Sequence, residues 1–312
     1  MRILLLGGSG QLGKCLHDEL AKWASVSAPS SSVLDVRRGD DVADAITSYR
    51  SNLTINACAF TEVDKAETDV ASATAINADS LTAIGTAQAA IGGGVIHFST
   101  DYVFDGTKKT PYLETDPTKP INQYGKSKLA GEHNLFETGV PAWVFRVSWL
   151  YSAEGKNFLQ TMLRLFEERN EISIVNDQFG APTSVYSLAR QISDILASGL
   201  QNEGNTGIYN LTCGGKASWY DFALACNRLA IQHGITSNDE MILSPIPSSA
   251  YPLPAQRPAN SCLSNEKFKQ TFGGAMPHWQ AALNDVMKIL VANKSNKTHQ
   301  AGSDDELKED DT

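Results

Sequence analysis

The stretch Ile3-Leu4-Leu5-Leu6-Gly7-Gly8-Ser9-Gly10-Gln11-Leu12-Gly13 decides the fold of this chain. Its first four residues form a short apolar run of the kind that becomes a buried strand, and the glycines follow directly, where a helix begins. Gly7 allows a tight turn, Gly10 lets a pyrophosphate approach the backbone at the helix N-terminus, and Gly13 lets helix and strand pack closely. The stretch therefore predicts a dinucleotide site at the first strand–helix turn.

Outward from this turn, the first 150 residues alternate short apolar runs with helix-like stretches, which is the pattern of βαβ units around a parallel sheet. We expect strands at 3–6, 25–28, 54–57, 95–99 and 142–147, and helices at 12–23, 42–49, 69–91 and 122–136. The predicted fold class is α/β: a Rossmann-type doubly wound parallel sheet of six or more strands, with a smaller α/β substrate domain.

The pattern changes after Trp149. We expect helices at 156–169, 185–200, 219–233 and 277–293 and strands at 172–175 and 207–211, with a proline-rich stretch from Pro245 to Pro258 running extended over the surface. These patterns predict a dinucleotide-binding domain over 1–150, completed by returning segments from the second half, and a substrate domain over 151–293. Residues 294–312, rich in Ser, Asp and Glu, are predicted to form a disordered acidic tail.

Composition narrows the class of protein. The 312 residues carry a formal net charge of −9, so the chain lacks the basic surplus typical of nucleic-acid binding. No apolar stretch approaches the length of a signal peptide core or a membrane span, which predicts a cytoplasmic protein. The cysteines lack metal-ligand spacing and are expected to be reduced thiols; they are Cys15, Cys58, Cys213, Cys226 and Cys262.

Tyr124 and Lys128 are the candidate catalytic pair. Positions four apart share one face of a helix, so the phenol and the amine are expected to point into one pocket. A cation beside a phenol favours the phenolate, which would lower the pKa of Tyr124 toward working pH and suit it to proton transfer onto a carbonyl oxygen. The spacing alone is common on solvated helices, so its context behind the glycine turn gives it weight.

Two further segments end predicted strands. Thr100 and Asp101 follow the strand at 95–99, and ligands of open α/β sheets bind beyond the carboxyl ends of strands. His97, inside the same apolar run, is expected to be a core histidine rather than a base. The run Asn56-Ala57-Cys58-Ala59-Phe60-Thr61 either leaves room for a cofactor or is a small-residue turn without function.

The residues after the second strand bear on cofactor choice, because an acid there bonds the ribose and repels a 2′-phosphate. This chain has Pro29-Ser30-Ser31-Ser32 and no acid until Asp35. Arg37 and Arg38 could pair with a 2′-phosphate, although a pair of arginines in a loop is more often solvated surface. We expect NADPH as the cofactor, with NADH tolerated.

Together these residues resemble the extended short-chain dehydrogenase/reductase family, and longer phrases resemble its dTDP-4-dehydrorhamnose reductases across residues 1–293. The phrases are Ser99-Thr100-Asp101-Tyr102-Val103-Phe104-Asp105-Gly106, Tyr124-Gly125-Lys126-Ser127-Lys128-Leu129-Ala130-Gly131-Glu132, Phe145-Arg146-Val147-Ser148-Trp149-Leu150-Tyr151, Asn176-Asp177-Gln178-Phe179-Gly180-Ala181-Pro182-Thr183 and Arg257-Pro258-Ala259-Asn260-Ser261.

The resemblance implies reduction of the 4-keto group of dTDP-4-dehydro-β-L-rhamnose to dTDP-β-L-rhamnose, the last step of dTDP-L-rhamnose biosynthesis. It implies that Tyr124 donates the proton to the C4 oxygen, that Lys128 holds the nicotinamide ribose, and that Thr100 stands where Ser is usual. The implied sugar contacts are Thr100, Asp101, Tyr124 and Trp149. The implied cofactor contacts are Gly7, Gly10, Gln11, Leu12, Gly13, Asp35, Val36, Ala59, Phe60, Thr61, Tyr124 and Lys128.

Two other readings stay open. The family also resembles the non-catalytic β subunit of methionine adenosyltransferase, and a reductase or epimerase of another nucleotide sugar would differ near Trp149 and Gln178. We predict no metal, because no glutamate set matches the Mg²⁺ contact of some family members. A nucleotide-sugar substrate, no nucleic-acid or membrane partner and a possible homodimer complete the expectations.

Overall fold

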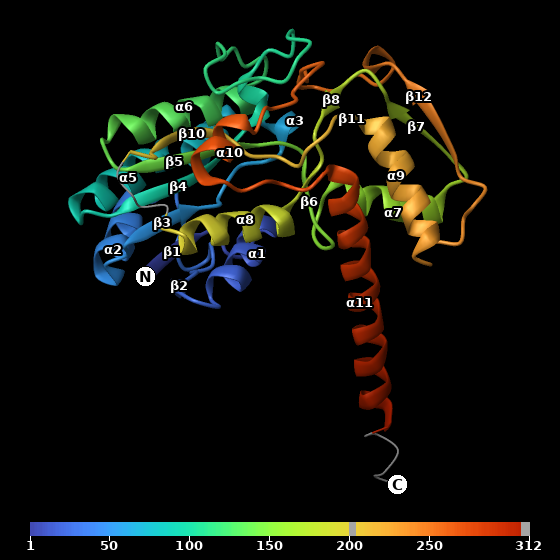
Figure 1. Cartoon of the computed structure of the whole chain (residues 1–312), viewed down its shortest axis with the longest axis horizontal. Helices are drawn as coiled ribbons and strands as arrows, with labels where there is room; N and C mark the ends of the chain where they lie inside the picture. The colour runs from blue at the N-terminus through green and yellow to red at the C-terminus, as the bar shows by residue number, and fades with distance from the viewer. Residues whose placement is uncertain (200–203, 307–312) are drawn as a thin grey trace.

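A six-stranded parallel sheet organises the computed structural model, which describes residues 1–199 and 204–306 (Figure 1). Its strand order is β10-β5-β4-β3-β1-β2, and every neighbouring pair is parallel. The apolar run of the first strand is buried because both faces of the sheet are covered. The strands are β1 (Arg2–Leu6), β2 (Ser25–Ser27), β3 (Leu53–Asn56), β4 (Gly94–Thr100), β5 (Ala142–Val147) and β10 (Gly207–Asn210).

Helices cover both faces of this sheet. Leucines of α1 (Gln11–Leu20) pack with apolar residues of α8 (Val185–Ala197) in one core cluster. On the other face, α2 (Gly39–Tyr49) and α5 (Ser80–Ala90) form a second cluster with Leu135 of α6 (Gln123–Glu137). The predicted doubly wound fold is confirmed, and its sheet includes β10 and is covered by α8, both from the second half of the chain.

The sheet reverses its winding at β1, which lies between β2 and β3. The carboxyl ends of β1, β3 and β4 therefore meet at one edge, beside the point where the connections depart to opposite faces. This edge carries the glycine turn after Leu6, the run after Asn56, and Thr100 at the end of β4.

The helix predicted over 69–91 is interrupted. It consists of α4 (Val70–Thr74), a π-helical turn η1 (Ala75–Asp79) and α5. The wider turn brings the Asn77 side chain inward, where it is buried. Such π turns are frequent at functional sites, and nothing in the apolar spacing of this Ala-rich segment signals one.

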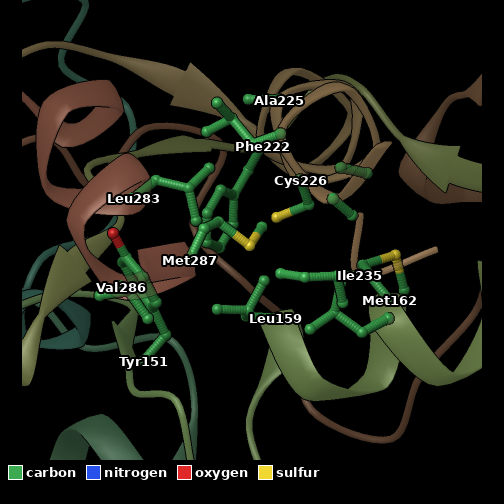
Figure 2. Close-up of a cluster of buried hydrophobic side chains, with 14 of the residues drawn as sticks. Tyr151, Leu159, Met162, Phe222, Ala225, Cys226, Ile235, Leu283, Val286 and Met287 are labelled. Atoms are coloured by element: carbon green, nitrogen blue, oxygen red, sulfur yellow. The ribbon is translucent and has the colours of Figure 1, made fainter. Parts of the chain in front are cut away.

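The second half has a core of its own (Figure 2). Tyr151, Leu159 and Phe222 lie in this cluster, and Leu283 and Met287 enter it from the C-terminal helix. Its larger elements are α7 (Phe158–Glu168), β7 (Glu171–Val175), α9 (Trp219–Gln232), β12 (Ile242–Ile246) and α11 (Trp279–Glu306). The remaining short elements are α3 (Val63–Ala66), η2 (Asp101–Val103), β6 (Leu150–Tyr151), β8 (Phe179–Gly180), β9 (Thr183–Ser184), β11 (Ala217–Ser218), η3 (Ser248–Ala250) and α10 (Glu266–Phe272).

The C-terminal helix is longer than the sequence indicated. We predicted its end near Asn293 and disorder over 294–312, but α11 continues to Glu306 and its last part extends away from the other elements (Figure 1). The sequence gives no strong signal for this extension, because residues 295–306 contain few strong helix formers and include Gly302, although no proline interrupts them. The disorder predicted for 307–312 lies outside the described residues. Among the described helices, none is long and apolar enough to span a membrane.

Candidate active site

A cleft of about 650 Å³ lies at the carboxyl edge of the sheet. Its walls come from the glycine turn, the ends of β3, β4 and β5, the first turns of α6, and the segment before α7. The structure brings together many of the predicted site residues here: Gly10, Gln11, Leu12, Ala59, Thr61, Thr100, Asp101, Tyr124, Lys128 and Trp149 all line the cleft.

The glycine turn has the geometry that its sequence predicts. Gly7 has a φ of 80°, and a Cβ there would lie 2.8 Å from the backbone of Ala57. A Cβ on Gly13 would lie 2.0 Å from the Gly7 carbonyl oxygen, so the helix can approach the turn only without a side chain. No side chain caps α1 at Gly10, which leaves the helix N-terminus open to an anion such as a pyrophosphate.

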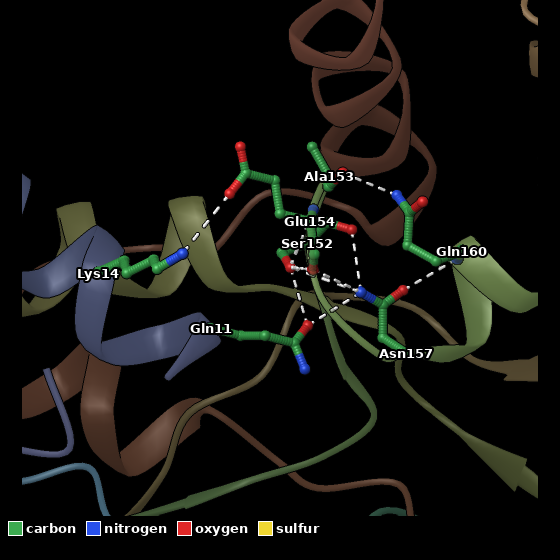
Figure 3. A network of polar contacts seen from close by, with 7 residues as sticks. All are labelled: Gln11, Lys14, Ser152, Ala153, Glu154, Asn157 and Gln160. Carbon is green, nitrogen blue, oxygen red and sulfur yellow. Dashed lines mark hydrogen bonds and ion pairs between the residues drawn. The ribbon is translucent and has the colours of Figure 1, made fainter. Parts of the chain in front are cut away.

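Gln11 joins the glycine turn to the second half of the chain (Figure 3). Its Oε1 accepts hydrogen bonds from Ser152 Oγ at 2.8 Å and from Asn157 Nδ2 at 2.9 Å, and its Nε2 donates to the Lys156 carbonyl at 3.1 Å. The segment 152–157 is thereby held across the start of α1. The side-chain amide of this predicted cofactor contact is engaged by the protein itself, so its part in the site is to hold this segment over the turn.

Tyr124 and Lys128 lie on one face of α6, as predicted, and both line the cleft. The helix begins there because Asn122 accepts a hydrogen bond from the Gly125 amide at 2.7 Å. A Cβ on Gly125 would lie 2.2 Å from the Tyr102 carbonyl oxygen. A glycine directly after Tyr124 thus lets the first turn of α6 approach the end of β4, where Thr100 lies.

The expected lowering of the Tyr124 pKa is wrong for this structure. Burial raises the pKa of Tyr124 to about 12, although a hydrogen bond with the Thr100 hydroxyl lowers it in part. The amine of Lys128 turns toward the sheet and donates to the Phe98 carbonyl at 2.6 Å. Tyr124 is therefore kept protonated, in the form that can give a proton away.

Burial also lowers the pKa values of Lys128 and His97. Burial lowers the pKa of Lys128 to about 8, against the opposing effect of the Glu132 charge. His97 is a buried core histidine, as expected, but its Nε2 lies 3.2 Å from the Lys128 Nζ. Burial lowers the pKa of His97 well below its usual value, and the Lys128 charge adds to this.

Asp101 is a buried carboxylic acid that lines the cleft. Its Oδ1 accepts a hydrogen bond from Thr100 Oγ1 at 3.0 Å, and its Oδ2 is buried. Burial raises the pKa of Asp101 to about 7, and hydrogen bonds with Ser261 and Thr100 oppose this. Asp101 lines the cleft, so its carboxyl group can bind a polar ligand there.

Trp149 lines this cleft, and Trp219, on which its ring stacks, lines a second cleft of about 820 Å³. The backbone of Trp149 has a φ of 47°, and its ring stacks on Trp219 with a centroid distance of 3.5 Å. A Cβ on Gly180 would lie 2.5 Å from the Trp149 ring, so this glycine makes room for the stack. Trp219 and Gln178 line the second cleft.

The family model described as "RmlD substrate binding domain" matches residues 1–292. The chain belongs to this family. A dTDP-4-dehydrorhamnose reductase of Burkholderia thailandensis is 42% identical to it over 94% of this chain and 100% of the relative. This chain is thus similar to the RmlD-family proteins over nearly its whole length.

Solved structures of dTDP-4-dehydrorhamnose reductases are also similar to this chain. A dTDP-4-dehydrorhamnose reductase of Clostridium acetobutylicum has a TM-score of 0.86 and 34% identity, covering 93% of this chain and 99% of that one. A dTDP-4-dehydrorhamnose reductase of Bacillus anthracis, solved in complex with NADP, has a TM-score of 0.84 and 31% identity, covering 91% of this chain and 98% of that one.

Some predicted residues of this RmlD-family chain lie away from the cleft. Val36 is buried in the core cluster under α2, and Phe60 lines a neighbouring pocket. Asp35 is bound by Arg37, whose Nε lies 3.0 Å from Oδ1, and Arg38 lies 3.6 Å from Asp41. The Arg37 guanidinium lowers the pKa of Asp35 to about 2, so this carboxylate is already neutralised by a partner.

Sequence reasoning missed Asn77, which supports this RmlD-family site from the π turn. Asn77 accepts a hydrogen bond from the Phe60 amide at 2.8 Å and donates to Ser127 Oγ at 2.9 Å. A Cβ on Gly131 would lie 2.0 Å from the Asn77 carbonyl oxygen, which explains a glycine in the middle of α6. The unusual Asn-Ala-Asp break in an Ala-rich helix was the available signal.

Sequence reasoning also missed a buried ion pair beneath the cleft. Arg146 of β5 binds Glu132 of α6 through two nitrogens, at 2.9 Å and 2.6 Å, and Ser99 donates to the same carboxylate. The side chains of the pair are 2% and 1% exposed. In the described part of the chain, no group of three or more His, Cys, Asp or Glu residues could hold a metal ion.

Proposed function

We propose that this chain reduces the 4-keto group of dTDP-4-dehydro-β-L-rhamnose to dTDP-β-L-rhamnose with NADPH, the last step of dTDP-L-rhamnose biosynthesis. The observation that carries the proposal is the convergence of Thr100, Asp101, Tyr124 and Lys128 on the cleft that opens beside the glycine turn. The chain's membership of a family whose relatives are dTDP-4-dehydrorhamnose reductases supports the substrate and the reaction.

The cofactor fits the glycine turn. A Cβ at Gly7 or Gly13 would collide with backbone, and the uncapped start of α1 offers N–H groups to a pyrophosphate. We assign Gly10 and Leu12 to the contact with the pyrophosphate. Ala59, Thr61 and Lys128 are assigned to the cleft walls around the rest of the cofactor. When bound, the cofactor supplies the hydride that reduces C4 of the sugar.

Side chains of the cleft supply the proton that the sugar oxygen needs. Tyr124 is protonated at working pH and can donate its phenolic hydrogen to the C4 oxygen as that oxygen gains charge. Thr100, hydrogen-bonded to both Asp101 and Tyr124, orients the phenol and can contact the same oxygen. Protonated Lys128 stabilises the phenolate that remains, and Trp149 forms the wall against which the sugar lies.

NADPH is the preferred cofactor in this proposal, with NADH tolerated. The first acid after β2, Asp35, is already bound by Arg37, so its carboxylate is not free to repel a 2′-phosphate. The exposed Arg38 can turn toward such a phosphate. The related Bacillus anthracis structure contains NADP, which supports this preference.

We also propose that residues 1–150 with α8, β10 and α10 form the dinucleotide-binding domain and 151–293 the substrate domain. The separate core cluster of the second half supports this division (Figure 2). A cytoplasmic location and a homodimer without nucleic-acid or membrane partners complete the proposal.

The test is consumption of NADPH and of NADH with enzymatically generated dTDP-4-dehydrorhamnose, followed by identification of the product. The proposal expects dTDP-rhamnose, with turnover faster for NADPH. Cofactor binding without turnover would favour a regulatory subunit resembling the methionine adenosyltransferase β subunit. Turnover of a different nucleotide sugar alone would favour the other reductase or epimerase reading.

A further inference from the structure

His97 lies inside β4 and contacts two polar side chains. The proposed reaction gives no role to His97 or to these contacts. The His97 ring is fully buried. Its Nδ1 lies 3.3 Å from Asn56 Nδ2, across the register of β3 and β4, and its Nε2 lies 3.2 Å from Lys128 Nζ. Burial on this scale forces each of these atoms to find a compatible partner.

Asn56 fixes which nitrogen of the ring carries the hydrogen. Asn56 Oδ1 accepts a hydrogen bond from the Cys58 amide at 3.0 Å, so its amide nitrogen is the atom that faces His97. An amide nitrogen only donates, and His97 Nδ1 must therefore accept. A neutral imidazole has one donor and one acceptor, so Nε2 carries the hydrogen. Turning the Asn56 amide over would set its NH₂ group against the Cys58 N–H.

The Nε2–H group then points at Lys128. An ammonium has three donors and no acceptor, so a charged Lys128 would meet this group donor to donor. A neutral amine satisfies every contact, because its lone pair accepts from His97 Nε2–H while its own N–H donates to the Phe98 carbonyl at 2.6 Å. The lowered pKa values of Lys128, to about 8, and of His97 agree with this pattern.

We propose that Asn56 and His97 are positioning residues that govern the charge of Lys128: the ring of His97, held by Asn56 as the Nε2–H tautomer, binds the neutral amine, and charging of Lys128 requires the tautomer to reverse. In that reversal the Nε2 proton passes to Nζ, which becomes an ammonium, and one proton from solvent ends on Nδ1. The net change is one proton bound.

The other titratable groups around Lys128 do not produce this coupling. Glu132, one turn along α6, favours the charged amine, but its carboxylate is already bound by Arg146. Burial raises the pKa of the Cys58 thiol to about 11, so it is neutral at working pH. Tyr124, on the same face of α6, stays protonated because burial raises its pKa. Only the ring of His97 exchanges its donor and acceptor sites.

The direct test is ¹⁵N NMR of the protein labelled in histidine, with His97→Gln used to assign the ring. Above the pH at which Lys128 titrates, we expect the Nε2–H tautomer, and on lowering the pH through about 8 we expect the Nδ1–H tautomer to replace it. An Nδ1–H ring at high pH, or a tautomer that does not change with pH, would overturn the proposal. This measurement needs no substrate, so it can fail independently of the proposed function.

Asn56→Asp provides a second variant that keeps the shape of the site. One carboxylate oxygen can still accept from the Cys58 amide while the other accepts from His97 Nδ1–H, which leaves Nε2 free to accept from charged Lys128. We expect the Nδ1–H tautomer at all pH values, and the alkaline fall in kcat, which rests on the proposed need for charged Lys128, should move up by about one pH unit. A shift in kcat without the change of tautomer would show a simple charge effect and overturn the role of His97.

Discussion

At the scale of single residues, burial in the cleft shifts the pKa values of ionisable groups toward their uncharged forms. Tyr124 remains a phenol, and Lys128 and Asp101 titrate near neutral pH because burial penalises their charged forms. A proton donor that does not ionise early suits reduction of a carbonyl, since the proton must still be present when the oxygen needs it.

Asp101 predicts a pH dependence of stability. Its folded pKa of about 7 lies above its ordinary value, so between about pH 4 and pH 7 the folded protein holds a proton that the unfolded chain releases. The contribution of Asp101 to the free energy of unfolding therefore falls as pH rises through this range, by on the order of 4 kcal/mol in total. Asp101→Asn cannot titrate and should lose this decline. Denaturant unfolding of both proteins at several pH values measures it, and parallel pH profiles would contradict the assignment.

The residues of the site were largely predictable, but their chemical states were not. Thr100, Tyr124 and Lys128 follow from motifs whose spacing places them at a strand end and on one helix face. The lowered pKa predicted for Tyr124 failed because spacing along α6 reveals neither the burial of the phenol nor that the Phe98 carbonyl and His97 hold the Lys128 amine. Contacts between distant segments decide such states.

At the scale of elements, α6 is held against the sheet by groups that its own sequence does not reveal. The Arg146–Glu132 pair joins β5 to α6, and Asn77 of the π turn contacts the helix at Ser127. Helix and strand positions were predictable from apolar spacing, whereas the π turn was not, because Ala-rich segments carry little periodic signal.

The buried ion pair predicts an asymmetric response to mutation. Arg146→Met removes one partner and leaves the Glu132 carboxylate buried without its cation, which should lower the free energy of unfolding by about 3 to 5 kcal/mol. The double variant Arg146→Met/Glu132→Leu removes both charges and should recover much of this loss. Guanidinium unfolding of the three proteins provides the comparison. A double variant less stable than the single one would show that the pair itself contributes net stability.

At the scale of the whole molecule, hydrogen bonds of Gln11 connect the glycine turn to the second half of the chain (Figure 3). The overall α/β architecture was predictable from the alternation of strands and helices. The connection was not, because Gln11 and Asn157 are 146 residues apart and neither sits in a pattern that indicates the other. The longer α11 was also missed, since acidic composition was taken as a sign of disorder.

Gln11→Leu tests this connection. Loss of its three hydrogen bonds should free the segment 152–157 and raise KM for both NADPH and the nucleotide sugar by several-fold, with about 1 kcal/mol or more of lost stability. Gln160→Leu is the matched control, because Gln160 donates to the Ala153 carbonyl within the second half of the chain. Equal effects of the two substitutions on KM would contradict a role for Gln11 in joining the two halves.

The measurement that tests the central claim most directly is turnover of dTDP-4-dehydrorhamnose by Tyr124→Phe beside the wild type. Tyr220→Phe serves as the control, since its hydroxyl bonds only the Leu243 carbonyl away from the cleft. We predict that Tyr124→Phe lowers kcat by about 100-fold or more while NADPH affinity stays within about twofold, and that Tyr220→Phe turns over normally. Undiminished turnover by Tyr124→Phe, or loss of NADPH binding in its place, would contradict the assignment of Tyr124 as the proton donor.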